Sequence, residues 1–205
     1  MTAHPLQLAG TAASDVCWDW LAPAVTMAAA ACGAHPLADH ATLDWTRFPR
    51  VATRTPGLDA RSVSVARDFS LATLRRWGVT DRADDIAIVV SELLTNALRH
   101  GIPDPARGRR RWPVRLGLVQ PGQTVLCAVA DPSPRVPVPK EPDYFAENGR
   151  GLHVISALSD TWGCTTPTTA GKVVWAVFSV SFGRPEHHSG GSVAEHGQRV
   201  RSRSL

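Results

Sequence analysis

Residues 84–101 constrain the fold of this chain more than any other segment. Their apolar side chains recur at steps of three and one, which at about 100° per residue form a single stripe of a helix. The stripe consists of Ile86, Val89, Val90, Leu93, Leu94 and Ala97. Thr80 or Asp81 is placed to cap the start, and Gly101 followed by Pro103 ends the pattern. The sequence therefore predicts an amphipathic helix buried along one side.

The polar residues of this helix fall beside its apolar stripe. Glu92 and Asn96 stand one turn apart, with Asp85 in the same row and His100 turned further into the stripe. In a half-buried cleft, an amide oxygen can ligate a hard cation and a carboxylate can accept a proton. The alternative is an ordinary amphipathic helix whose polar side begins at Glu92, and spacing alone favours that alternative.

Composition predicts one domain with extensions, because 205 residues and 43% hydrophobic content can supply a core. The net charge of +4 is uneven, since residues 1–46 contain no Lys or Arg and arginines cluster at 107–115. That cluster lies in a loop with Trp112 as its one interleaved aromatic residue, which is typical of a solvated surface. We therefore expect no nucleic-acid partner.

Cysteine usage and hydropathy indicate a cytoplasmic protein. The four cysteines are widely separated and form no CxxC, so neither a zinc site nor a disulfide framework is indicated. The apolar run at 21–34 lacks a basic region before it and is too short to span a bilayer. No membrane association is expected.

The order of predicted elements favours an α/β (α+β) two-layer sandwich, with a mixed, largely antiparallel sheet covered on one face by helices. An Ala-rich helix near 25–32 is permitted by the sequence. The expected elements are a short strand within 43–51, a helix at 62–77 stopped by Gly78, the central helix, strands at 114–120 and 124–130 joined as a hairpin, a proline-rich loop at 132–148, a helix that begins near 150, and strands at 162–165 and 172–182.

Three parts follow from this order. Residues 1–44 are an extension of undetermined role, 45–182 form the folded domain, and 183–205 are polar and expected to be disordered. The loop at 132–148 is too long to be an ordinary connection in a compact domain, so we expect it to be a functional lid.

Two further positions could belong to a binding site. Gly149-Arg150-Gly151 precedes a helix, where backbone N–H groups and the helix dipole can hold phosphates, although such a pair of glycines also occurs at ordinary turns. Asp131 at a strand end could accept a hydrogen bond from an exocyclic amine, or be a turn residue.

Taken in order, these residues resemble the Bergerat-fold (GHKL, histidine-kinase-like) ATPases. Glu92-Leu-Leu-Thr-Asn96-Ala with His100 looks like the N box of that superfamily, Asp131 like the aspartate of its first glycine box, and Gly149-Arg150-Gly151-Leu152 like its second. The short chain and residues 91–101 most resemble the anti-sigma-factor serine kinases, among them the ATP-binding regulators of actinomycetes. The resemblance covers about 45–182.

The resemblance implies a cofactor, ATP with Mg²⁺, and a role for each residue. Asn96 would coordinate Mg²⁺, Asp131 would bind the adenine amine, and Gly149, Arg150 and Gly151 would hold phosphates, with Leu152 beside them. Glu92 would accept the proton of an attacking hydroxyl. His100 would touch the nucleotide pocket, whereas its place at a helix end favours a role in capping carbonyls.

Two departures from the family pattern bear on nucleotide affinity. Pro132, Ser133 and Pro134 follow the aspartate where the family has glycines, and Gly171-Lys172 replaces a common Gly-Thr. The second change removes a hydroxyl that helps to order the adenine contact.

Two functions remain from different classes. One is a protein serine/threonine kinase that phosphorylates an anti-sigma-factor antagonist and also binds a sigma factor. The presence of Glu92 favours this function. The other is a non-catalytic, nucleotide-gated regulator that sequesters a protein partner. The altered glycine boxes favour this second function. A structural domain without nucleotide ranks below both. The resemblance also implies a homodimer.

Overall fold

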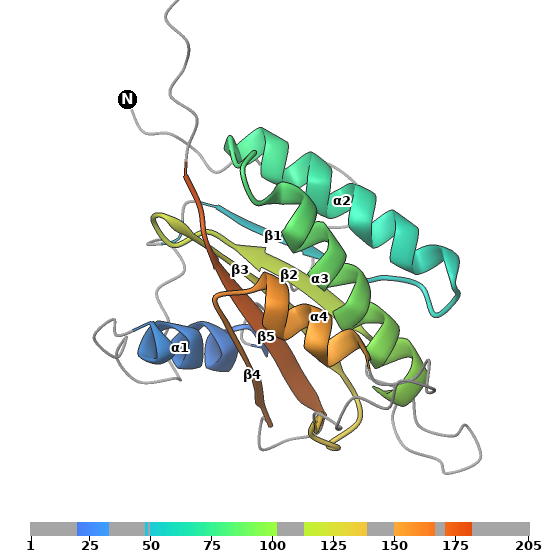
Figure 1. Ribbon diagram of the computed structural model, residues 1–205. Helices are drawn as coiled ribbons and strands as arrows, with labels where there is room; N and C mark the ends of the chain where they lie inside the picture. The colour runs from blue at the N-terminus through green and yellow to red at the C-terminus, as the bar shows by residue number, and fades with distance from the viewer. Residues whose placement is uncertain are drawn as a thin grey trace, which may run out of the picture.

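In the computed structural model, residues 20–32, 48, 50–101, 113–138, 150–166 and 171–181 are described. Figure 1 shows helices packed on a twisted sheet. In chain order the elements are α1 (Ala22–Ala31), β1 (Val51–Arg54), α2 (Arg61–Trp77), α3 (Ala83–Asn96), the π-helical turn η3 (Ala97–Gly101), β2 (Arg115–Val119), β3 (Thr124–Asp131), α4 (Arg150–Leu158), β4 (Thr161–Thr165) and β5 (Lys172–Ser179).

The five strands form one sheet in the order β1-β2-β3-β5-β4. All of its pairings are antiparallel, which confirms the largely antiparallel sheet and the predicted β2–β3 hairpin. The central pairing joins β3 to β5 and places Asp131 directly opposite Lys172. The end of one central strand and the start of the other therefore meet at the same end of the sheet.

One face of the sheet is covered by α2, α3 and α4, as predicted. The stripe of α3 is buried there, with Ile86, Val90 and Leu94 wholly inaccessible to solvent. These residues pack with alternate side chains of the central strands, among them Cys127 and Phe178, in one continuous core. The predicted α/β fold, with helices packed on this face of an antiparallel sheet, is therefore confirmed.

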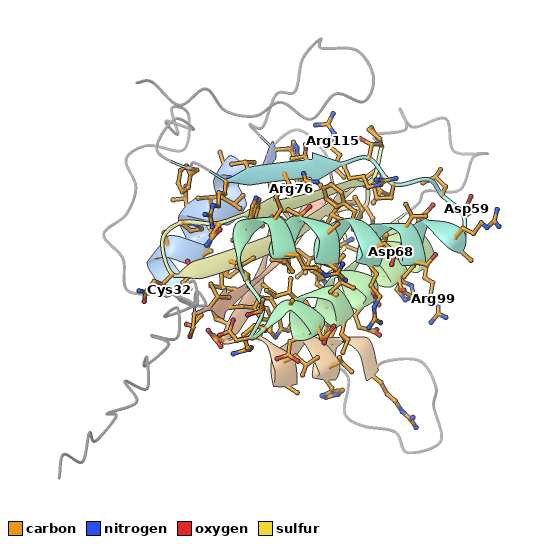
Figure 2. The ribbon with its side chains drawn as sticks, turned by 90° about the horizontal axis from the view of Figure 1, so that it is seen from above. Cys32, Asp59, Asp68, Arg76, Arg99 and Arg115 are labelled. Carbon is orange, nitrogen blue, oxygen red and sulfur yellow. The ribbon has the colours of Figure 1, made fainter. Side chains whose placement is uncertain are left out.

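The opposite face of the sheet is covered by α1, a role that the sequence did not reveal. Leu21, Val25 and Ala28 pack against the alternate set of strand side chains, including Trp175 and Val177. Figures 1 and 2 both place α1 apart from the other three helices. Burial from both sides explains why β3 and β5 are apolar almost throughout rather than alternating.

The predicted end of α2 is confirmed, whereas the predicted cap at the start of α3 is not. Gly78 ends α2 in the left-handed conformation, with φ 77°, as predicted. In contrast, the N-cap of α3 is Arg82, without a side-chain cap, so the expectation of a cap by Thr80 or Asp81 was wrong. The carboxylate of Asp81 instead accepts a hydrogen bond from the Ser181 backbone N–H at 2.9 Å, which ties α3 to the end of β5.

Arg82 also fixes α4 relative to α3. Its guanidinium pairs with Asp85 at 3.0 Å and donates a hydrogen bond to the Leu158 carbonyl at 2.6 Å. It further lies 5.5 Å from the centroid of the Phe178 ring. The last turn of α4 is thereby held against the first turn of α3.

The strand expected within 43–51 starts later than predicted. β1 runs from Val51 to Arg54 and pairs with β2 from Val51↔Val119 onward. Pro49 cannot donate to a strand ladder, which accounts for the start after it. Most of 43–49, part of the loop at 132–148, and the tail at 183–205 lie outside the described residues. Among the described helices, none is long and apolar enough to cross a membrane.

Packing of α1 predicts a difference between two substitutions near it. Leu21→Ala removes a wholly buried side chain and should lower the free energy of unfolding by about 3 kcal/mol. Met27→Ala changes a side chain that is 47% exposed on the same helix and should cost less than about 0.5 kcal/mol. Urea titration of both variants measures this, and equal small effects would show that α1 does not pack on the sheet.

Candidate functional site

Glu92 and Asn96 occupy one row of α3 at the border of the core. They are four residues apart, both are half-buried, and Leu93 and Leu94 between them are buried. Two polar groups are thus held side by side on a helix whose other face is fixed by packing. Neither is in open solvent, which makes them suitable for binding a polar ligand.

Gly151 brings the first turn of α4 directly onto this pair. A Cβ added at Gly151 would lie 2.8 Å from Glu92 Oε2, 3.3 Å from Asn96 Nδ2 and 3.5 Å from Asn96 Oδ1. Any larger residue would push the carboxylate of Glu92 aside. Glycine therefore allows the start of α4, with the positive end of its helix dipole, to approach α3 closely.

This arrangement suits phosphates and a hard cation. Free N–H groups at a helix start bind phosphate oxygens, and Mg²⁺ takes few protein ligands when phosphates supply the others. Asn96 offers one amide oxygen and Glu92 one carboxylate in the space that a Cβ at position 151 would fill. Among the described residues, no cluster of three or more His, Cys, Asp or Glu could hold a metal by itself. The donor set thus fits a cation shared with a ligand.

Asp131 ends β3 on the same face of the sheet and is bound by two neighbours. Lys172 Nζ lies 2.8 Å from each carboxylate oxygen, and the Ser133 backbone N–H donates to Oδ1 at 2.9 Å. The side chains of Asp131 and Lys172 are only 2% and 7% exposed. The pair is therefore a buried ion pair at the edge of the candidate site.

Burial raises the pKa of Asp131, while Lys172 and the Ser133 N–H act in the opposite direction. The thiol of Cys164 feels both charges of the pair, although burial is the main reason that its pKa is raised. Cys164 therefore lies near the ion pair, on β4.

The π-helical turn η3 carries the end of the central helix onto Asp131. A Cβ at Gly101 would lie 2.5 Å from Asp131 Cγ, so the backbone of Gly101 rests on the carboxylate. The turn is continuous with α3, so a single helical segment contacts α4 at Glu92 and Asn96 and contacts β3 at its end. Turns of this kind recur at functional sites.

The remaining predicted residues are placed as follows. His100 is exposed, so the expectation that it turns into the apolar stripe was wrong; the wider π-helical turn changes the direction of side chains after Ala97. Arg150 is exposed at the start of α4 and Leu152 is half-buried beside Gly151. Gly149 lies outside the described residues.

Sequence reasoning did not identify Lys172 as a partner of Asp131. The sequence marked Lys172 only as a departure from the family's Gly-Thr, whereas the structure shows that its side chain is buried. A signal was available, since a lysine at the start of a fully apolar strand needs a buried counter-charge, and Asp131 ends another such strand. The register of the two strands, which brings them together, is not visible in the sequence.

Comparison with curated proteins gave no match. Among solved structures, the RsbU and RsbW domains of Rv1364c from Mycobacterium tuberculosis are similar, with a TM-score of 0.46 and 16% identity. The match covers 63% of this chain and 32% of that chain. This chain thus spans about a third of the length of that structure.

The profile of one protein family matches residues 57–178, which is more than half of the chain. The matched segment runs from the start of α2 to β5 and includes Glu92, Asn96, Asp131 and Gly151. It leaves out α1 and β1. The chain belongs to the family of the histidine kinase-like ATPase domain.

Proposed function

We propose that this chain is an ATP-dependent protein serine/threonine kinase of the anti-sigma-factor type. The observation that carries the proposal is the contact of Gly151 with both Glu92 and Asn96. It brings the start of α4, the amide of Asn96 and the carboxylate of Glu92 together, which supports a site for phosphates and a cation there. Membership of the histidine kinase-like ATPase family supports nucleotide binding there.

In this proposal Mg²⁺ neutralises phosphate charge when MgATP is bound. Asn96 would hold the cation through its amide oxygen, and Gly149, Arg150, Gly151 and Leu152 would bind the phosphates. Asp131, where η3 meets β3, would be the residue that faces the purine base. His100, exposed one residue before Gly101, lies at the rim of this region.

Glu92 is the base of the proposed reaction. Its carboxylate accepts the proton of a partner's serine or threonine hydroxyl as the oxygen attacks the γ-phosphorus, and the bond to the β-phosphate oxygen breaks to release ADP. Such catalysis consists largely of positioning and charge neutralisation, so few protein groups are required. Glu92 contributes by its place beside the phosphate-binding turn.

The proposed partner is an anti-sigma-factor antagonist, with a sigma factor as a second partner and a homodimer as the assembly. The ground for this assignment is the resemblance of residues 91–101 to the anti-sigma-factor serine kinases. A nucleic acid or a membrane is not part of the proposal.

A second candidate is a nucleotide-gated regulator that binds its partner without phosphoryl transfer. The observation that favours it is the ion pair of Lys172 with Asp131. This ion pair occupies the carboxylate that is expected to bind the adenine amine of the nucleotide. Retention of Glu92 favours the kinase, because a pure binder needs no proton acceptor there.

MgATP binding tests the site itself. Asn96→Ala removes the proposed magnesium ligand and should weaken MgATP binding about tenfold or more. The reason is that the loss of one polar contact to a charged group costs roughly 1.5–3 kcal/mol. Ser64→Ala, on the exposed side of α2, is the matched control and should leave affinity unchanged. Titration calorimetry measures both. Equal affinities for Asn96→Ala and wild type would place the cation elsewhere.

Phosphoryl transfer tests the role of Glu92. Glu92→Gln keeps the size of the side chain but removes the proton acceptor, so transfer to a serine of an antagonist protein should fall about 10²-fold or more. MgATP binding should change little. Radiolabelled ATP and candidate antagonists provide the assay. Absence of transfer with every antagonist tested, despite MgATP binding by the wild type, would favour the non-catalytic regulator.

A further inference from the structure

The carboxylate of Asp131 is largely occupied by the protein itself. A carboxylate offers about four acceptor positions. The Ser133 N–H takes one at 2.9 Å, and Lys172 Nζ lies 2.8 Å from both oxygens. With 2% of its side chain exposed, Asp131 has little capacity left for a ligand.

Lys172 is held in this position by the backbone around it. Asp131 and Lys172 are directly opposite in the β3–β5 pairing, and Lys172 Nζ also donates to the Ser133 carbonyl at 3.3 Å. Gly171 precedes it with φ 85°, and a Cβ there would lie 2.3 Å from the Asp131 carbonyl oxygen. Strand register and close backbone packing thus both direct the lysine to this carboxylate.

We propose that Lys172 is a specificity-determining residue that occupies the base-recognition carboxylate, so that this site binds a nucleoside triphosphate through its phosphates and discriminates weakly between bases. The inference rests on the proposed nucleotide binding and concerns the same site. It names the ligand class more closely: nucleoside triphosphates with either a 6-amino or a 6-oxo purine.

The reason is a competition between two donors. The exocyclic amine of adenine is a neutral donor, whereas the ammonium of Lys172 makes charge-assisted hydrogen bonds, which are about twice as strong. Displacing the ammonium would also leave a buried charge without its partner. The amine therefore adds little binding free energy at Asp131, and the base contributes little to the choice of ligand.

The same geometry argues against a phosphate-binding role for Lys172. Its ammonium has three donor positions. They are directed to Asp131 and to the Ser133 carbonyl, and the side chain is 7% exposed. Phosphate binding then falls to the start of α4 at Gly151, beside the proposed cation ligand Asn96.

The test compares MgATP with MgGTP by titration calorimetry. Wild type should bind the two with dissociation constants within about threefold of each other. Lys172→Thr frees the carboxylate for the adenine amine and should favour MgATP by about tenfold or more, since a hydrogen bond to a charged group contributes roughly that factor. Lys172→Arg keeps an ion pair and should remain unselective. Arg76→Thr, a charge removal on the exposed side of α2, is the matched control.

A double variant covers the case in which Lys172→Thr is too unstable to measure. Lys172→Met with Asp131→Asn removes both buried charges, a change that folded proteins often tolerate. It should keep the wild-type affinity for MgATP within about threefold. A loss of about tenfold or more would show that Asp131 recognises adenine in the wild type, and would overturn the inference.

The outcomes separate this inference from the proposed function. Wild type that already prefers MgATP by about tenfold, or Lys172→Thr that gains no preference, overturns the role of Lys172 and leaves nucleotide binding intact. Absence of binding to either nucleotide, in wild type and all variants, overturns the proposed function and the inference with it.

Discussion

Burial of the apolar stripe of α3 is the interaction on which the rest of this structure depends. The stripe fixes the rotation of the helix against the sheet, because side chains such as Ile86, Val90 and Leu94 are wholly buried. Once that rotation is set, Glu92 and Asn96 must lie at the border of the core. The candidate site is therefore positioned by hydrophobic packing rather than by its polar residues.

The fold could be predicted well where local pattern and final environment agree. α2, α3, the β2–β3 hairpin and β5 were all visible as periodic or apolar runs bounded by Gly or Pro. The role of α1 could not be predicted, because an alanine-rich segment has no contrast between a polar and an apolar side that would indicate which surface it covers. The nearly continuous apolar runs of the strands indicated cover by helices, but the sequence predicted that cover on one face only.

The residues of the candidate site were likewise predictable only where they lie on one helix. Glu92 and Asn96 could be placed from helical spacing, because both lie on one element. Their contact with Gly151 depends on how α4 packs on α3, and the pair of Asp131 with Lys172 depends on strand register. His100 was misplaced because helical spacing was carried past Ala97, where the chain changes to a π-helical turn. Long-range geometry of this kind is decided by the whole core.

The two edges of the sheet limit how another chain can bind by backbone pairing. With helices on both faces, the described part of the sheet leaves β1 and β4 as its edges. β1 is four residues long and β4 is five. Such short edges offer few backbone hydrogen bonds to an added strand. A protein partner of this domain would then depend mainly on side chains of the helices and loops, which makes its recognition a matter of surface chemistry rather than of sheet extension.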